Sequence, residues 1–547
     1  MRSAGAREER GFYVRRTLRV GAAVAVLAVM VAACKSNSST AGGSGAPNSS
    51  ATIVHGTTDS IVSLDPAGQY DLGSQQISGE IYDNLLVIPA GGNTPEASAA
   101  QSCAYSDPKT YTCTLKPGLK FSDGSPLTSE DVAFSFKRNL EINDPNGACS
   151  LLNAINKPGA DGCKWNPASI DTPDDATITF HLNAPDATWP MILTSSAAYI
   201  VPSDVFPETK LQPDDKVIGS GHYTLTKYTP GQQVVLAPNP NWWGDPPANG
   251  GVIVQYFDKS SALKLALEQG DVDVGWRTFT PTDVEGMKGE SQLQVLTGPG
   301  SEIRYLVFNE SFPAGKELAV RQAVAMTVDR QAIVHNVYND TVAPLWSMVP
   351  SALPGHIDAF KDAYGDSPDV AGAKKALQDA GISTPVPLEI WWTPTHYGDS
   401  SADEYAEIKR SLESSGLFTV TLKSTEWDTY INAAVTDQYP NYQLGWFPDY
   451  PDPDNYVFTF YSSASFLNDH YKNAKVDQLL ADERASTDQA QRVKDFQEIQ
   501  KIGAQDVPIV PIWEGRQLAV TTQGITGVQD TLDVAYLLRY WMIGKSS

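Results

Sequence analysis

Four cysteines that follow the N-terminal region carry the most specific chemistry of this sequence: Cys103, Cys113, Cys149 and Cys163. An even number of cysteines is typical of disulfide bonds in an oxidising compartment, and four cysteines permit three pairings. A zinc site would need closely spaced cysteine pairs and nearby histidines, which are missing here. Because Cys103 and Cys113 lie symmetrically about the turn signal 106–110, they can face each other across a hairpin. The pattern therefore favours the local pairs Cys103–Cys113 and Cys149–Cys163.

A fifth cysteine, Cys34, follows a segment that is typical of exported proteins. Arginines precede an apolar run, 20–33, which is shorter than the roughly 20 residues of a membrane-spanning helix. The run therefore predicts a signal peptide at 1–33. Val31-Ala32-Ala33-Cys34 resembles the bacterial lipoprotein box, whose cysteine is lipidated; an ordinary secretory signal is the alternative. We expect 34–51 to be a lipidated, flexible tether on the outer face of the bacterial cytoplasmic membrane, at a cell surface or in a periplasm.

Carboxylates are abundant, but their pattern gives no sign of catalysis. The sequence has 64 Asp and Glu against 40 Lys and Arg, and its formal net charge of -24 repels nucleic acid. It contains neither G-x-S-x-G nor H-E-x-x-H, and its seven histidines are scattered. We therefore expect no enzyme activity, no cofactor, no metal and no nucleic-acid partner. An exported hydrolase is the weaker hypothesis.

Strand and helix signals alternate along the chain, and these elements must position any site. The capping box at 128–131 marks one helix start, while Ser367-Pro368 and Gly381 mark the start and the end of another. A strand-rich first half and a strand–helix second half predict two α/β lobes. Strands are expected at 53–57, 111–115, 177–182, 234–237, 388–392 and 507–513, and helices at 77–87, 128–140, 320–328, 367–381 and 493–502.

Five segments in consistent order resemble the peptide-type substrate-binding proteins of ABC importers, the dipeptide/oligopeptide-binding family 5. The stretch 111–138, YTCTLKPGLKFSDGSPLTSEDVAFSFKR, is similar to the signature of that family. The resemblance extends from about Ile53 to the C-terminus. The other matching segments are 219–244 (with GSGHY and NPNWWG), 308–330, 445–453 (GWFPDYPDP) and 507–513.

The resemblance implies an α/β periplasmic-binding-protein fold of the venus flytrap type, in its large class with an extra subdomain in lobe I. Hinges would lie near 301–305 and 511–515. Ligand would be held in the cleft between the lobes, and a membrane permease would recognise the closed form. The implied boundaries are lobe I at 52–302, including the extra subdomain at about 90–215, lobe II at 303–512, and a return to lobe I at 513–547.

The resemblance also implies ligand contacts. Gly445, Trp446 and Phe447 match a strand that pairs with the main chain of a bound peptide, which is β-augmentation. Asp449 matches the aspartate that accepts the ligand α-ammonium; the alternatives are a turn-forming residue or a calcium ligand. Trp427, like Trp446, matches an aromatic residue that lines side-chain pockets, and an ordinary core position is the alternative for both.

Further features of the sequence bear on the ligand. Tyr70 and Asp71 fall in the segment 68–74, which the resemblance implies for lobe I's side of the cleft. Gln443 stands where some oligopeptide-binding relatives carry an arginine near the ligand carboxylate, so the carboxylate partner is unassigned. An oligosaccharide is the alternative ligand, since tryptophan suits sugar stacking. We expect a monomeric subunit that delivers peptides to an ABC permease.

Overall fold

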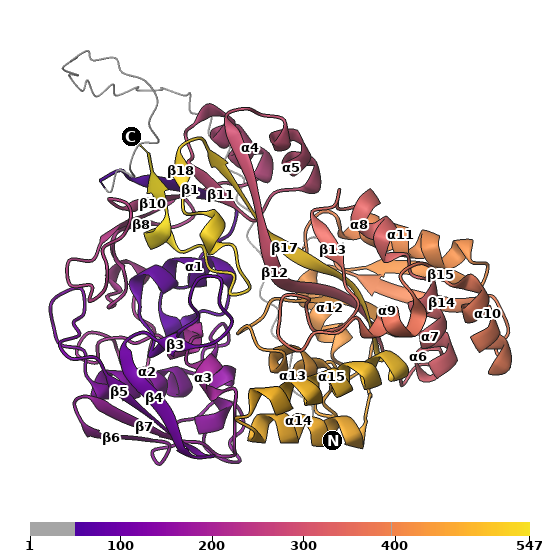
Figure 1. The fold of residues 1–547 in the computed structure, drawn as a ribbon, viewed down its shortest axis with the longest axis horizontal. Coiled ribbons are helices and arrows are strands. Elements are labelled where there is room, and N and C mark those ends of the chain that lie inside the picture. The colour runs from indigo at the N-terminus through magenta and orange to yellow at the C-terminus, as the bar shows by residue number, and fades with distance from the viewer. Residues whose placement is uncertain (1–49, 395, 547) are drawn as a thin grey trace, which may run out of the picture. The chain divides into compact units, whose positions relative to one another are not determined.

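The computed structural model of the protein describes residues 50–394 and 396–546 (Figure 1). The predicted signal peptide at 1–33 and the predicted lipidation site Cys34 lie outside the described residues. All described residues belong to one structural unit. Within them, we find no helix with the length and apolar character that a membrane crossing requires.

A large mixed sheet runs through the described part of the chain, where it has eleven strands. Its centre is an antiparallel pair of long strands, β12 (Leu293–Phe308) and β17 (Ile509–Thr522), which join the two ends of the sheet (Figure 1). In order, the sheet contains β15 (Phe418–Ser424), β14 (Val386–Trp392), β16 (Asn441–Trp446), β12, β17, β11 (Val274–Trp276), β1 (Ile53–Thr57), β10 (Val252–Tyr256), β9 (Gln233–Pro238) and β8 (Tyr223–Thr229), with β13 (Val342–Pro344) also paired to β17.

Helices accompany both ends of this sheet, in agreement with the predicted α/β class. On the β1 side they are α1 (Leu72–Ile81), α4 (Ser260–Gln269) and α5 (Pro281–Lys288). The later helices are α6 (Pro313–Lys316), α7 (Leu318–Thr327), α8 (Arg330–Asn336), α9 (Ala359–Tyr364), α10 (Val370–Asp379), α11 (Ser401–Ser414), α12 (Trp427–Ala434), α13 (Asp454–Tyr461), α14 (Ala474–Ala485) and α15 (Gln489–Asp506). The described chain also contains short 3-10 turns and two-residue strand pairs: η1 (Pro66–Gly68), η2 (Cys149–Ile155), η3 (Ser196–Ala198), η4 (Asp214–Lys216), η5 (Gln529–Thr531), η6 (Tyr540–Met542), β2 (Leu86–Val87) with β3 (Glu96–Ala97), and β18 (Ile525–Thr526) with β19 (Gly544–Lys545).

A second sheet forms a separate layer within the region 90–215. Its order is β4 (Ala100–Asp107), β5 (Thr110–Leu115), β7 (Thr177–His181) and β6 (Ile170–Asp174), and it packs with α2 (Ser129–Ile142) and α3 (Trp189–Ile192). Cys103 and Cys113 are direct cross-strand partners and form a disulfide. Cys149 and Cys163 form the other, so the structure contains the local pairing that the hairpin pattern favours.

Several helices differ at their ends from the sequence prediction, and for α1 and α10 the cause is clear. The helix expected at 77–87 is α1, which begins at Leu72 because Asp71 caps it and which ends at Ile81; the chain then continues in extended form to β2. Leu85 lies beyond the helix but is buried, so the spacing of apolar residues predicted a helix that extends too far. The helix expected from Ser367-Pro368 is α10, whose N-cap is Asp369, with the carboxylate accepting from Gly372 N–H at 2.8 Å.

The β12–β17 pairing is irregular at one place. Its register shifts between Pro299 and Ile303, and again between Arg304 and Tyr305. Register shifts interrupt the regular ladder of a strand pair; a β-bulge, for example, bends a strand and increases its local twist. The first hinge segment predicted from the sequence, 301–305, falls on this irregularity.

Candidate ligand-binding site

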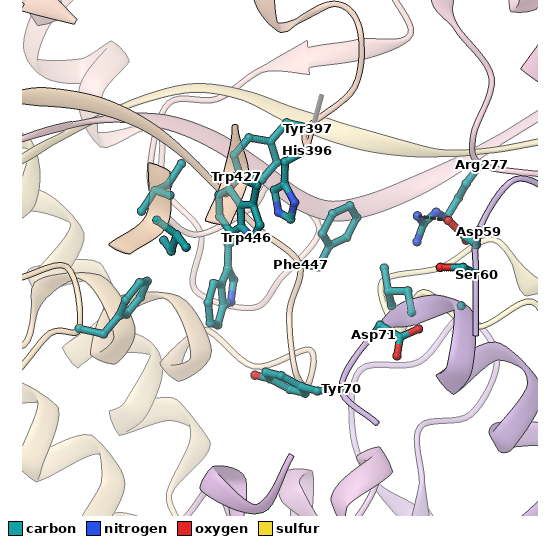
Figure 2. A pocket seen from close by; sticks show the side chains of 16 residues that line it. Asp59, Ser60, Tyr70, Asp71, Arg277, His396, Tyr397, Trp427, Trp446 and Phe447 are labelled. Carbon is teal, nitrogen blue, oxygen red and sulfur yellow. Dashed lines mark hydrogen bonds and ion pairs between the residues drawn. The ribbon is translucent and has the colours of Figure 1, made fainter. Parts of the chain in front are cut away.

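A cavity of about 420 Å³ lies where the end of β16 faces the start of α1 (Figure 2). We call its two sides the first wall and the second wall. The first wall consists of Asp59, Ser60, Tyr70, Asp71, Leu72, Gly73 and Arg277. The second wall consists of His396, Tyr397, Trp427, Ile431, Leu444, Gly445, Trp446, Phe447 and Phe466. All the predicted ligand contacts belong to these walls except Asp449, whose carboxylate accepts a hydrogen bond from the lining residue Tyr70.

The edge of β16 gives the second wall its main-chain chemistry. Along one edge, β16 pairs with β12 from Asn441 to Trp446. Along the other edge, β14 meets it only through Trp391 and Tyr442, so among the described residues the edge beyond Tyr442 has no strand partner. Burial raises the pKa of Tyr397, and the nearby Gly445 backbone lowers it part of the way, so the Tyr397 hydroxyl lies close to this edge. Main-chain groups of β16 are therefore left for a further strand.

A buried arginine explains why position 445 is glycine. A Cβ atom there would lie 2.3 Å from Nη1 of Arg304, the residue opposite it on β12. The Arg304 guanidinium is fixed by an ion pair with Glu302 at 2.5 Å and by the Tyr397 ring, whose centroid is 4.2 Å away. Arg304 is only 3% exposed, so it has little room to yield. A side chain at position 445 would therefore collide with the buried Arg304, and glycine avoids this.

Aromatic rings make most of the second wall apolar. Trp427, the first residue of α12, stacks on His396 with a centroid distance of 3.5 Å. Burial, and to a lesser degree the Arg304 charge, lowers the pKa of His396 to about 4, so this ring is neutral near pH 7. Trp446 packs edge-on against Phe460 and donates its indole N–H to Asn455 Oδ1 at 2.9 Å. Rigid rings of this kind form pockets suited to apolar groups.

Asp449 connects the two walls. Its carboxylate accepts hydrogen bonds from the Tyr70 hydroxyl and from Asn455 Nδ2, the latter at 2.9 Å. Its own N–H donates to Asn455 Oδ1 at 3.0 Å, so the first turn of α13 fixes its position. Burial raises the pKa of Asp449 above its ordinary value, while the bonds from Tyr70 and Asn455 lower it part of the way. A carboxylate with two hydrogen bonds has further acceptor capacity.

The first wall carries further carboxylates. Asp71 caps α1 by accepting from Ser74 N–H at 2.8 Å, and its other oxygen is buried without a hydrogen-bond partner among the described residues. Burial is the main cause that raises the pKa of Asp71, and the neighbouring charge of Asp59 raises it further. Asp59 lies within reach of Arg277, whose Nη2 donates to it at 3.3 Å. This wall therefore has a mixed charge.

Several lining residues have no counterpart in the sequence prediction, notably Asp59, Arg277, His396 and Tyr397. None of these residues lies in or next to the motif 445–453, and only the fold brings them to the cavity. Gln443, in contrast, is fully buried outside the lining, and its amide oxygen faces the N–H of Thr393 at 3.4 Å. Position 443 therefore does not present a group to the cavity.

Comparisons with known proteins agree with this architecture. The family model described as bacterial extracellular solute-binding proteins, family 5 Middle, matches residues 94–468. A probable D,D-dipeptide-binding periplasmic protein, DdpA, of Escherichia coli strain K12 is 28% identical over 495 residues, covering 86% of this chain and 90% of that protein. The periplasmic oligopeptide-binding protein OppA of the same strain is 25% identical over 519 residues, covering 90% and 92%.

A solved structure shows the same fold. The periplasmic binding protein DppA of Helicobacter pylori, in complex with the peptide STSA, has a TM-score of 0.75 at 22% identity, covering 91% of this chain and 98% of that one. This likeness confirms the predicted periplasmic-binding-protein fold. With a family model that matches most of its length, the chain belongs to family 5 of the bacterial extracellular solute-binding proteins.

Proposed function

We propose that this protein is the substrate-binding subunit of an ABC importer and that it captures peptides in the cavity for delivery to a membrane permease. The observation that carries the proposal is the edge of β16 beyond Tyr442, which faces the cavity without a strand partner among the described residues. An extended peptide can add to such an edge through main-chain hydrogen bonds. The names of the E. coli relatives, a probable D,D-dipeptide-binding and an oligopeptide-binding protein, support the same ligand class.

In this proposal, Gly445, Trp446 and Phe447 supply the main-chain pairing. A peptide carbonyl would accept the Gly445 N–H, which lies near the Tyr397 hydroxyl in this structure. The rings of Trp427 and Trp446 would hold the ligand's side chains, and an apolar aromatic wall tolerates different side chains because its contacts are not directional. Affinity would then come mainly from the backbone, and pocket shape would set the tolerance for sequence.

Asp449 would receive the α-ammonium of the peptide. Its carboxylate accepts a hydrogen bond from Tyr70, a residue of the first wall, and in its ionised form it can accept a further one. A charge-assisted bond in a site that excludes water contributes about 1.5–3 kcal/mol. Tyr70 and Asp71 would contribute from the first wall, so the ligand would contact both sides of the cavity.

The hydrogen bond between Tyr70 and Asp449 joins two regions that we assign to different lobes, so it bears on how ligand binding would change the arrangement of the lobes. We divide the chain into lobe I at 52–302 and 513–547, with an extra subdomain at about 90–215, and lobe II at 303–512. A ligand that contacts both walls favours the closed arrangement, which the permease would recognise. The register shifts of β12 at Pro299–Tyr305 support a hinge there. Catalysis has no part in this proposal.

The membrane attachment is also proposed from the sequence. A signal peptide at 1–33 and a lipidated Cys34 would hold a monomeric protein on the outer face of the cytoplasmic membrane. Two acyl chains on one cysteine suffice for stable anchoring, since each buried methylene contributes about 0.8 kcal/mol. Mass spectrometry of the N-terminal peptide from a bacterial membrane fraction tests this, because an unmodified Cys34 would contradict it.

A thermal-shift experiment tests the ligand class. The protein from residue 35 onward is stripped of ligand by unfolding and refolding, then melted with defined peptides, their N-acetylated forms and oligosaccharides. A ligand at 100 times its Kd stabilises the folded state by about 2.7 kcal/mol, enough to raise the melting temperature measurably. A rise with free-amino peptides supports the proposal. A rise with oligosaccharides alone would refute peptide capture and keep the importer role.

A further inference from the structure

Arg277 is the single cation in the lining of the cavity, as far as the described residues show. The other charged groups of the first wall are the carboxylates of Asp59 and Asp71. His396 of the second wall is neutral near pH 7 because burial lowers its pKa to about 4. A ligand that carries a carboxylate therefore meets one positive partner in this cavity. The chain as a whole is strongly acidic, with a formal net charge of -24, so a cation at this place is a specific feature.

The guanidinium of Arg277 has unused donor capacity. Its Nη2 donates to Asp59 at 3.3 Å, which is a long contact, whereas Nη1 is buried and has no hydrogen-bond partner among the described residues. Leaving a buried charged donor unpaired costs free energy. An incoming acceptor therefore gains more at this nitrogen than at one that is already paired.

The structure holds Arg277 firmly in this position. The backbone N–H of Arg277 donates to the Leu518 carbonyl at 2.9 Å. The φ angles of Arg277 and Thr278, 59° and 57°, place two consecutive non-glycine residues in the left-handed region. Backbone strain of this kind often marks functional sites. The guanidinium also lies 5.3 Å from the Phe447 ring centroid. Arg277 is thus directed towards the strand that we propose to pair with the ligand.

We infer that Arg277 binds a carboxylate of the ligand, the C-terminal one of a captured peptide, and so serves as the carboxylate partner that position 443 does not provide. This inference rests on the proposed peptide function. Arginine presents parallel N–H donors that match the two oxygens of a carboxylate. A peptide would then be held by charge at both ends, with its ammonium on Asp449 and its carboxylate on Arg277. In Figure 2, Tyr70, which is hydrogen-bonded to Asp449, and Arg277 are drawn on different sides of Phe447.

Titration calorimetry with matched ligands and variants tests the inference at pH 7. The ligands are trialanine with a free C-terminus, the same peptide as its C-terminal amide, and an amidated tripeptide with a central glutamate. The variants are Arg277→Gln and, as control, Arg516→Gln, which removes an equal charge from an exposed position of β17 outside the cavity lining. Thermal melting of each variant checks that it folds.

The expected result is a difference in affinity that depends on Arg277. Wild-type protein and Arg516→Gln should bind the free acid about 10- to 100-fold more tightly than the amide. Arg277→Gln should bind both forms with the affinity that wild type shows for the amide. The amidated glutamate peptide has its only carboxylate on a side chain. If it binds wild type as tightly as the free acid does, and binds Arg277→Gln more weakly, Arg277 accepts a side-chain carboxylate as well.

Three results would overturn the inference. Equal binding of acid and amide by wild-type protein would remove the carboxylate contact, while peptide capture itself would stand. A preference for the acid that survives in Arg277→Gln would assign the carboxylate to another cation, such as Arg304. Equal weakening of acid and amide by Arg277→Gln would give Arg277 a structural role in shaping the first wall. Failure of wild type to bind any peptide would instead refute the proposed function.

Discussion

Replacing Asp449 by asparagine removes the proposed ammonium acceptor with little change in shape. The bond from Asn455 Nδ2 to the side chain of residue 449, 2.9 Å in length, can be kept because an amide oxygen also accepts. The bond from the N–H of residue 449 to Asn455 Oδ1 does not involve the side chain that is changed. We therefore expect Asp449→Asn to fold normally and to lose the negative charge, together with the oxygen that accepts from Tyr70.

The size of the effect follows from the bond that is lost. A charge-assisted hydrogen bond contributes about 1.5–3 kcal/mol, and about 1.4 kcal/mol corresponds to a factor of ten. Asp449→Asn should therefore weaken the binding of a free-amino peptide about 10- to 100-fold. An N-acetylated peptide has no ammonium, so its weaker affinity should be the same for both proteins.

The pH dependence provides an independent check. Burial raises the pKa of Asp449, so part of its titration in the free protein takes place above the range of an ordinary aspartate. Only the ionised carboxylate attracts an ammonium, so affinity should be complete above the raised pKa and fall as the pH drops through it. The ratio of free-amino to acetylated peptide affinity should show this fall in wild type and not in Asp449→Asn.

Titration calorimetry between pH 4.5 and pH 8 measures both effects. The ratio of the two affinities cancels contributions from other groups that titrate in the same range, such as Asp71. If wild type binds the free-amino and acetylated forms equally, or if Asp449→Asn weakens both forms by the same factor, Asp449 is not the ammonium acceptor.

Three further predictions concern stability and the cavity lining. Burial raises the pKa of Asp469 to about 7, so the free energy of unfolding should fall by up to about 4 kcal/mol from pH 4 to above pH 7; pH-dependent melting should show a weaker slope for Asp469→Asn. Replacing Cys149 and Cys163 by alanine should cost about 3 kcal/mol by the chain-entropy account, and reductant should then lower the melting temperature less than it does in wild type. Gly445→Ala should displace Arg304 and weaken peptide binding at least tenfold in calorimetry. Unchanged affinity would show that Arg304 can move aside without any effect on binding.

Local sequence signals predicted many elements because their causes are local. The strand expected at 53–57 is β1, and the capping box at 128–131 opens α2 with Thr128 as its N-cap. The errors have local causes as well. Asp369 caps α10 because its carboxylate, rather than the Ser367 side chain, meets the first free N–H groups. The helical period of α1 continued past Ile81 because the extended chain that follows is buried too.

The sequence by itself also determined the family, and it predicted which strand borders the cavity, since motifs such as GWFPDYPDP are contiguous. It could not reveal what faces that strand. Tyr70 and Asp449 are 379 positions apart. The left-handed backbone at Arg277 could not be predicted either, because neither Arg277 nor Thr278 is a glycine. Periodicity reports which side of an element is buried, not which distant element covers it. The charges around the cavity, including the unpaired Nη1 of Arg277, were therefore decided by tertiary contacts alone.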